Sequence, residues 1–317
     1  MNILVTGGAG YIGKIFIEKY HSKFNKIYVI DNLYDSFNEG FPSNVIFLEN
    51  DFGNKSALDK VFSDKIECVF HFAAFAAIGE SNSNPRKFFD NNVGQMLVLL
   101  NKMIDNGCMK LIFSSSAATF GNPVSLPIDE NHLKKPINSY GETKLIGEKM
   151  LKWYNTAYGL KSISLRYFNA AGAYGHLGEN RKKETHILPL IFDAIKKNKV
   201  FSIFGNDYNT SDGTCVRDYI HIEDLVDAHM LSYTKLDNVN FASFNLGSEN
   251  GTSNLDLIKI TSNLLNKEIR FEFKKRRDGD PDTLIASSED AKKILGWNNK
   301  KNIEDIISSL IKYYKIK

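Results

Sequence analysis

The chain has 317 residues, of which 43% are hydrophobic and 24% are charged, and its formal net charge is +3. This length and composition favour one large domain or two coupled lobes around a sizeable core. The dispersed basic residues argue against a nucleic-acid groove, and no apolar run approaches the ~20 residues that span a bilayer.

Three well-separated cysteines, Cys68, Cys108 and Cys215, have neither metal-ligand spacing nor the even number typical of a disulfide framework. They fit a reducing compartment. No leader-like segment precedes the first predicted strand. We therefore expect a cytoplasmic protein with no metal, no membrane contact and no nucleic-acid partner.

The first thirty residues have the pattern of a β-α-β unit. An apolar strand at residues 3–5 is followed by Gly7, Gly10 and Gly13, and then by apolar residues at helical spacing. Small residues at such a turn let backbone N–H groups and the helix N-terminus approach a pyrophosphate. The order predicts a dinucleotide-binding turn; the alternative is a tight turn without a ligand.

Acidic residues follow the next two predicted strands, residues 27–30 and 45–48. Asp31 is placed to accept hydrogen bonds from an adenosine ribose, and its charge would repel the 2′-phosphate of NADP, so NAD is favoured. Asp51 and Phe52 could flank an adenine, with a carboxylate for its amino group and a ring for its face. Asp51 could equally cap the following helix.

A fully apolar fourth strand is predicted at residues 68–74. Its end, residues Phe72, Ala73 and Ala74, has small side chains where a cofactor could lie close, whereas His71 has the character of a core histidine. A helix is predicted at residues 85–104. It carries Asn92, which is either a buried, satisfied amide or a site residue.

Serines end the fifth predicted strand, residues 110–115, where an open α/β sheet faces its ligand crevice. Ser116 could donate to, or relay a proton from, a substrate hydroxyl. On the helix predicted at residues 140–158, Tyr140 and Lys144 are four apart and share one side. An ammonium near a phenol lowers the phenol pKa from ~10 toward neutrality, so that it can take a hydroxyl proton. The alternative is a surface lysine beside a half-buried tyrosine.

The alternation of strands and helices, including a strand at residues 162–168, predicts an α/β fold with a doubly wound parallel sheet. We expect residues 1–169 to form this Rossmann domain and residues 170–317 to form a smaller substrate-binding lobe. A strand near residues 241–247 is expected to return to the main sheet. Arg217 and Arg277 are candidates to grip a diphosphate, since guanidinium forks match phosphate oxygens.

The chain resembles the extended short-chain dehydrogenase/reductases and, within them, the UDP-glucose 4-epimerase family, over nearly its full length. The broader motifs are TGGAGYIG at 6–13, DNL at 31–33, NNV at 91–93, SSS at 114–116 and YGETK at 140–144. The narrower motifs are RYFN at 166–169, FGNDY at 204–208, DGT at 212–214, VRDYIH at 216–221 and RRDGDP at 276–281.

The resemblance implies a role for each matched position. A tightly held NAD would contact Gly7, Gly10, Tyr11, Ile12, Gly13, Asp31, Asn32, Asp51, Phe52, Phe72, Ala73, Ala74, Asn92, Ser116, Tyr140, Lys144 and Phe168. A UDP-sugar would contact Ser116, Tyr140, Asn169, His186, Ile187, Phe204, Arg217, Arg277, Asp280 and Leu284. The implied catalytic set is Tyr140, Lys144 and Ser116.

The activity implied is interconversion of UDP-glucose and UDP-galactose through a transient 4-keto sugar, with NAD retained. Leu284 stands at the family's gate position, where a bulky tyrosine favours UDP-glucose, so UDP-GlcNAc and UDP-GalNAc would also fit. Ala76 replaces a lysine common in the family, which removes one cofactor contact. The resemblance also implies a homodimer formed through helices near residues 85–104 and 140–158.

Three other functions use the same fold. A nucleotide-sugar 4,6-dehydratase needs an acidic pair where this chain has Ala117 and Ala118. Another UDP-sugar epimerase, acting on a uronate or a pentose, stays open. A non-catalytic NAD-binding protein on the same fold would be marked by loss of Tyr140, Lys144 or Ser116, and all three are present.

Overall fold

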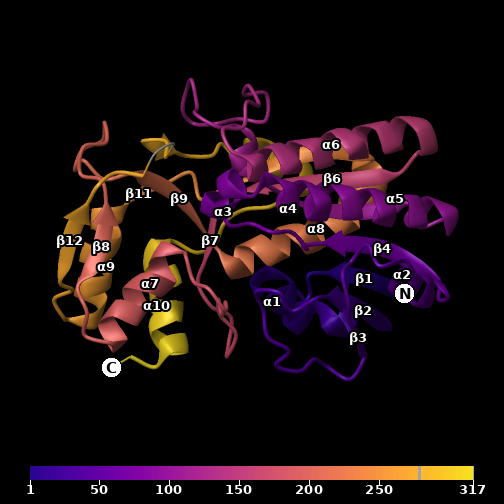
Figure 1. Ribbon diagram of the computed structural model, residues 1–317, viewed down its shortest axis with the longest axis horizontal. Helices are drawn as coiled ribbons and strands as arrows, with labels where there is room; N and C mark the ends of the chain where they lie inside the picture. Colours follow the sequence, from indigo (N-terminus) through magenta and orange to yellow (C-terminus); the bar gives the residue numbers. More distant parts are fainter. Residues whose placement is uncertain (278–279, 317) are drawn as a thin grey trace.

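The centre of the molecule is a sheet of seven parallel strands in the order β10-β6-β5-β4-β1-β2-β3 (Figure 1). The computed structural model describes residues 1–277 and 280–316. It confirms the doubly wound α/β fold, because helices cover both faces of the sheet. The strands are β1 (Asn2–Thr6), β2 (Lys26–Asp31), β3 (Val45–Glu49), β4 (Ile66–His71), β5 (Lys110–Ser116), β6 (Lys161–Tyr167) and β10 (Phe241–Leu246).

Alternate residues of each strand enter two separate cores, as the two-residue period of a strand requires. Ile3 and Val5 belong to a core shared with α1 (Tyr11–Tyr20) and α8 (Ile222–Val239). Leu4 belongs to the core on the opposite face. The helices packed there are α2 (Lys55–Phe62), α5 (Met96–Asp105) and α6 (Ser139–Tyr158).

Two predicted elements have different boundaries. Strand β4 ends at His71 rather than at residue 74, because the backbone N–H groups of Phe72 and Ala73 both donate to the Thr6 carbonyl and leave the ladder. The helix predicted at 85–104 is α4 (Pro85–Phe89), a π-helical turn (Asp90–Gln95) and α5. A short helix, α3 (Ile78–Ser83), precedes it.

Helix α6 is held close over the end of β5. The Asn138 side chain caps it by accepting from the Gly141 N–H at 2.8 Å. A Cβ atom at position 141 would lie 2.3 Å from the Ala118 carbonyl oxygen, so only glycine permits this approach. The first turns of α6 therefore lie directly against the serine-rich end of β5.

The C-terminal part forms a smaller lobe on the left of Figure 1, with an apolar core of its own. Strands β7 and β9 join it to the main sheet region. No helix among the described residues is both long and apolar enough to cross a membrane. The elements of the lobe are β7 (Asn169–Ala171), α7 (Ile187–Lys196), β8 (Phe201–Phe204), β9 (Val216–His221), β11 (Gly251–Ser253), α9 (Asn254–Leu265), β12 (Phe271–Lys274), β13 (Thr283–Leu284) and α10 (Ile303–Tyr314).

Candidate active site

The glycine turn between β1 and α1 has the geometry of an anion cradle. Gly7 has a φ of +72°, and a Cβ atom there would lie 2.6 Å from the Ala73 nitrogen. A Cβ at Gly13 would lie 2.4 Å from the Gly7 oxygen. Gly10 caps α1 without a side chain, and the first turn carries no acidic residue. The Gly7 and Gly10 N–H groups donate to carbonyls within the fold, but the first N–H groups of α1 have no capping side chain and can face a phosphate group, so the turn fits a dinucleotide.

Asp31 ends β2 beside this turn. Its Oδ2 accepts from the Ala9 N–H at 3.0 Å, and its Oδ1 accepts from the Leu33 N–H at 2.9 Å and from the Ser36 hydroxyl at 3.1 Å. Burial raises the pKa of Asp31, and these hydrogen bonds oppose that rise. The carboxylate is fixed next to the glycine turn, where the sequence places a ribose-binding group.

The aromatic face predicted at Phe52 is not available. Its side chain is only 5% exposed and packs within the core, with its ring centre 4.9 Å from that of His71. A buried ring cannot stack on an adenine, so this prediction is wrong, and only the Phe52 backbone and the exposed Asp51 remain candidates. Asn32 donates to Asp51 at 2.7 Å.

The capping alternative for Asp51 is also wrong. The N-cap of α2 is Asn54, whose side chain accepts from the Ala57 N–H at 3.0 Å. His71 is the core histidine that the sequence suggests: it lies 2.6 Å from the Thr6 hydroxyl, and burial lowers its pKa to about 3.

Asn92 is a buried and fully engaged amide. Its Oδ1 accepts from the Phe75 N–H at 2.9 Å, and its Nδ2 donates to the Phe75 carbonyl and the Thr143 hydroxyl, each at 3.0 Å. It therefore ties the segment after β4 to α6. The side chain lies in the π-helical turn, a feature that often marks functional sites. Its contact with a cofactor stays a prediction.

The three predicted catalytic residues come together where β5 ends under α6. Ser116 lies close enough to the Tyr140 phenol to lower its pKa, and Ser116 Oγ accepts from the Ala118 N–H at 3.1 Å. Lys144 Nζ donates to the Ser114 carbonyl at 2.6 Å and lies 5.9 Å from the centre of the Tyr140 ring. Tyr140 and Lys144 are both buried.

The structure does not show the predicted lowering of the Tyr140 pKa by Lys144. Burial raises the pKa of Tyr140, and the groups that oppose the rise are Ser116 and Arg181. Lys144 is itself so buried that its pKa falls to about 7. Its ammonium faces a carbonyl instead of the phenol oxygen. Spacing on the helix predicted the proximity correctly, but not the electrostatic effect.

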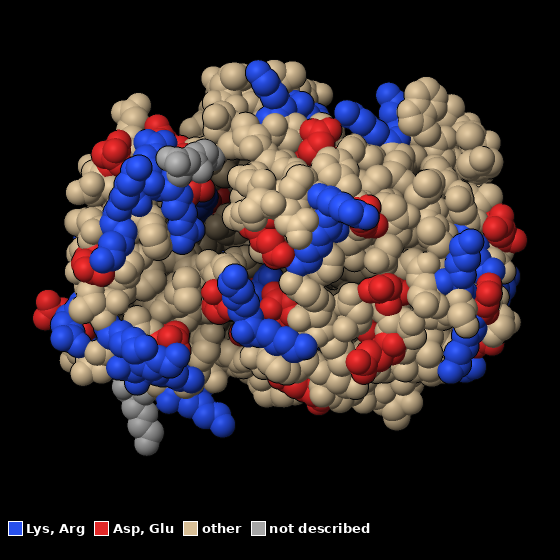
Figure 2. Space-filling model, in the orientation of Figure 1, with Lys and Arg blue, Asp and Glu red and all other residues tan. Residues whose placement is uncertain are grey.

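The predicted diphosphate grip lies in the smaller lobe. The Arg217 guanidinium is 3.9 Å from the Asp280 carboxylate, and the Arg277 guanidinium stands over the Phe204 ring at 4.2 Å. Leu284 lies in β13 opposite Arg217 in β9. Figure 2 shows a hollow between the lobe and the main body, with basic side chains on its rims. Asp278 and Gly279, within the RRDGDP motif, lie outside the described residues.

Asn169, His186 and Ile187 lie on the elements that join the two parts. Asn169 begins β7 and pairs with Tyr219 of β9. His186 is the N-cap of α7 and Ile187 is its first residue. Phe168 is buried in a small cluster with Ala117 at the end of β5, against which Leu284 packs. Phe168 and Leu284 therefore lie beside Ala117, the residue that follows Ser116.

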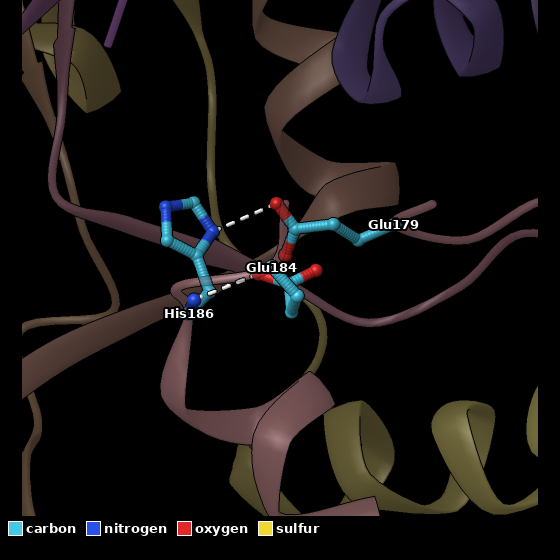
Figure 3. A group of neighbouring side chains, drawn as sticks. All are labelled: Glu179, Glu184 and His186. Atoms are coloured by element: carbon cyan, nitrogen blue, oxygen red, sulfur yellow. Dashed lines mark hydrogen bonds and ion pairs between the residues drawn. The ribbon is translucent and has the colours of Figure 1, made fainter. Parts of the chain in front are cut away.

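Glu179, Glu184 and His186 bring three possible metal ligands within 4.8 Å of one another (Figure 3). The Glu179 carboxylate already lies 2.7 Å from His186 Nδ1 and accepts from Arg181 Nε at 2.6 Å. One Glu184 oxygen accepts from two backbone N–H groups. Ion pairing and hydrogen bonding account for this cluster without a metal.

Sequence reasoning missed Arg181. It belongs to a charged run that has the pattern of a solvated loop, yet its guanidinium is held between Glu179 and Asp35, 3.4 Å away on the main domain. From there it favours the phenolate form of Tyr140. The residues next to Arg181 in the sequence do not indicate this position, because it exists only where the smaller lobe packs against the main domain.

Comparisons with known proteins agree with this geometry. A UDP-glucose 4-epimerase of Lacticaseibacillus casei is 45% identical over 311 residues, 96% of this chain and 93% of that protein. The solved UDP-glucose 4-epimerase of Bifidobacterium longum, in complex with NAD⁺ and UDP, is 33% identical with a TM-score of 0.93 and covers 99% of this chain and 98% of its own.

The UDP-Glc/GlcNAc 4-epimerase of Campylobacter jejuni is 32% identical with a TM-score of 0.84, covering 99% of both chains. The model of the NAD-dependent epimerase/dehydratase family matches residues 3–247. All seven strands of the central sheet lie almost entirely within that match. The chain therefore belongs to the NAD-dependent epimerase/dehydratase family.

Proposed function

We propose that this protein is a UDP-hexose 4-epimerase that interconverts UDP-glucose and UDP-galactose with a retained NAD. The observation that carries the proposal is the meeting of Tyr140, Ser116 and Lys144 at the end of β5, in a fold that also presents a glycine turn fit for a dinucleotide. The names of the relatives, UDP-glucose 4-epimerases at up to 45% identity over nearly the whole chain, support it.

The glycine turn, Asp31 and Asn32 would hold the dinucleotide, and Lys144 would bond its nicotinamide ribose. When bound, NAD⁺ takes up and returns a hydride, and its positively charged ring favours the phenolate of a nearby tyrosine. The absence of net redox change in an epimerisation is consistent with a cofactor that is kept instead of exchanged.

Tyr140 would accept the proton of the sugar 4-hydroxyl as general base, and Ser116 would relay or stabilise that proton. Burial of both Tyr140 and Lys144 excludes water from the transfer. The same two side chains would return the proton after the sugar has turned its other face. Proton transfer by a positioned group contributes ~10²–10⁴-fold to a rate.

Arg217 and Arg277 would clamp the diphosphate while the sugar rotates, and the partly exposed Phe204 ring offers a face to the uracil. Leu284 packs on the cluster containing Ala117 and Phe168, next to the catalytic serine. The leucine side chain is smaller than the tyrosine found at this position in some relatives. It therefore leaves more room beside the sugar, which favours acceptance of an N-acetyl group.

The test is incubation of the purified protein with UDP-galactose, UDP-GalNAc and UDP-uronates, without added NAD, followed by chromatography of the products. We expect UDP-glucose from UDP-galactose. The Tyr140→Phe variant should lose ~10²-fold or more of this activity while it keeps its bound NAD. Epimerisation of the uronates alone would show instead that the protein is a UDP-uronate epimerase. Normal turnover by Tyr140→Phe would contradict the role of the phenol as general base.

The gate position gives a prediction of its own. Leu284→Tyr should lower turnover of UDP-GlcNAc more than turnover of UDP-glucose, by on the order of tenfold in the ratio of their kcat/KM values, because the larger ring fills space needed by the N-acetyl group. Steady-state kinetics with both sugars measure the ratio. An unchanged ratio would remove Leu284 as a determinant of specificity.

We also propose a homodimer in the cytoplasm, built on the outer sides of α5 and α6. Leu97, Trp153 and Tyr158 expose 45%, 69% and 56% of their surface there and offer apolar area to a second copy of the chain. Sedimentation equilibrium should give twice the chain mass. A monomer at all concentrations would contradict the dimer without touching the proposed reaction.

A further inference from the structure

Helix α6 presents three functional groups, not two, to the end of β5. Tyr140, Lys144 and Glu148 follow one another at intervals of four and so share one side of the helix. Each meets a different serine of one strand end: Tyr140 meets Ser116, Lys144 meets the Ser114 carbonyl at 2.6 Å, and Glu148 accepts from the Ser115 hydroxyl at 2.5 Å.

Glu148 is anchored from behind by a residue of the neighbouring strand. Arg166 of β6 donates from Nε to Oε1 of Glu148 at 2.8 Å and from Nη2 to Oε2 at 2.6 Å, a bidentate pair with both side chains buried. Ser115 and Arg166 are direct partners in the β5–β6 register. The carboxylate therefore accepts three hydrogen bonds and joins α6, β5 and β6 at one point.

We infer that Glu148, held by Arg166, is a positioning residue that fixes the serine end of β5 and, through it, the places of Lys144 and Ser116. The inference rests on the proposed function. Glu148 does not touch the reacting groups itself. It acts through Ser115, which lies between Ser114, whose carbonyl accepts from Lys144, and Ser116, which lies near Tyr140.

The charges around the Lys144 ammonium predict in which direction its pKa changes when Glu148 is replaced. Burial lowers the pKa of Lys144 to about 7, and the negative charge of Glu148 opposes that fall. The other titratable or charged groups near it are Tyr140 on the same helix, His71 on β4, and Arg166 on β6 behind Glu148. Removing the Glu148 charge would therefore let the lysine lose its proton at a still lower pH.

A purely structural buried ion pair would give a different result. Loss of one member of a buried pair destabilises a protein because the other charge remains unpaired. Such an effect lowers thermal stability but has no reason to change the titration of one lysine. Asp224 of α8 is a matched control, because it is also a buried carboxylate, accepting from the Lys300 and Lys301 N–H groups on another part of the fold.

The experiment compares Glu148→Gln, Glu148→Asp and Asp224→Asn. Trace acetylation with acetic anhydride over a pH series, read by mass spectrometry on the peptide containing Lys144, gives the pKa of that lysine in the NAD-free protein. Thermal unfolding and the pH profile of kcat are measured alongside. The acetylation needs no sugar turnover, so it tests this inference even if the proposed reaction fails.

We expect Glu148→Gln to lower the pKa of Lys144 by about one unit or more and to move the alkaline limb of kcat to lower pH by a similar amount. Glu148→Asp should restore most of both shifts, since it keeps the charge. Asp224→Asn should lose stability and move neither. An unchanged lysine titration in Glu148→Gln, or equal shifts in Asp224→Asn, would overturn the inference.

If Glu148→Gln does not fold, Ser115→Ala serves as a second test variant. It removes the hydroxyl that donates to Glu148 and leaves the Glu148–Arg166 ion pair in place. We expect kcat to fall on the order of tenfold with little change in KM, as a small displacement of the strand end moves both Lys144 and Ser116 from their working positions. A wild-type kcat in Ser115→Ala would contradict the positioning role.

Discussion

At the scale of single residues, the site combines two groups that water would solvate better than the protein does. Tyr140 and Lys144 are both buried, and burial disfavours the charged form of each. For a phenol that must give and take a proton, and a lysine that must stay cationic, the surrounding hydrogen bonds have to offset this cost. Such a site is expected to reduce stability in exchange for activity.

This trade-off predicts that Lys144→Met stabilises the NAD-free protein while abolishing turnover. Below pH ~7 the wild-type fold carries a buried cation. Between ~7 and ~10.4 the folded protein loses that proton while the unfolded chain keeps it, so the free energy of unfolding rises by at most ~1.4 kcal/mol per pH unit. The gain in the variant should be larger at pH 6 than at pH 9, by urea denaturation at both values. A gain independent of pH would contradict the buried charge.

Residue spacing predicted which side chains meet, but not how they act on one another. The four-residue interval brought Tyr140 and Lys144 to one place, yet the lysine faces the Ser114 carbonyl. The ring of Phe52 went into the core because β3 and α2 bury that position. Both outcomes depend on which neighbours desolvate a group, and that information comes from strands distant in sequence.

At the scale of elements, α6 carries the chemistry and its first turn decides where Tyr140 lies. Its helical span was predicted from the sequence almost to the residue, and in the structure the helix ends at Gly159, which adopts the left-handed conformation typical of a helix end. The π-helical turn at Asp90–Gln95 could not be read in this way. It depends on Asn92 bonding to Phe75 and Thr143 in other segments.

The N-cap of α6 provides the prediction at this scale. Asn138→Ala should lower the free energy of unfolding by ~1 kcal/mol and also reduce kcat, because the loosened first turn carries the Tyr140 phenol. Asn54→Ala removes the equivalent cap of α2, away from the serine end of β5, and should cost similar stability without the loss of kcat. Equal effects of the two variants on kcat would argue against local positioning by the cap.

At the scale of the whole molecule, the segment after β7 binds the smaller lobe to the cofactor side of the sheet. Tyr11 donates to the Gly172 carbonyl at 2.6 Å, Lys182 Nζ donates to the Leu33 carbonyl at 2.6 Å, and Arg181 pairs with Asp35. These contacts cross from residues 172–182 to the start of α1 and to the loop that follows Asp31. They close the molecule over the turn where the dinucleotide would lie.

Arg181→Ala should therefore release NAD faster, by on the order of tenfold, and the release from wild type should quicken with salt, because this ion pair is partly exposed to solvent. Fluorescence of released cofactor, or NAD remaining after gel filtration, measures the rate. Lys26→Ala removes an ion pair with Asp64 elsewhere on the main domain and serves as control. Identical release rates in the two variants would count against retention by this segment.

Overall organisation was the part best predicted from sequence. The alternation of apolar runs predicted the parallel sheet, and the strand β10 joins it beside β6 as its apolar pattern suggests. The interlobe contacts were not predictable, because Arg181 and Lys182 stand in a loop with neither helical nor strand periodicity. Charged loops of this kind acquire their partners only when distant parts of the chain pack together.

The most direct measurement follows the hydrogen at C4 of the sugar. UDP-galactose deuterated at C4 is incubated in ordinary water with the protein as purified, without added NAD, and the product is examined by mass spectrometry and NMR. We predict UDP-glucose that keeps its deuterium at C4, since the hydride leaves and returns within one closed site beside Tyr140. Loss of the label to water, or no conversion until NAD is supplied in excess, would contradict an epimerase that works through a retained cofactor.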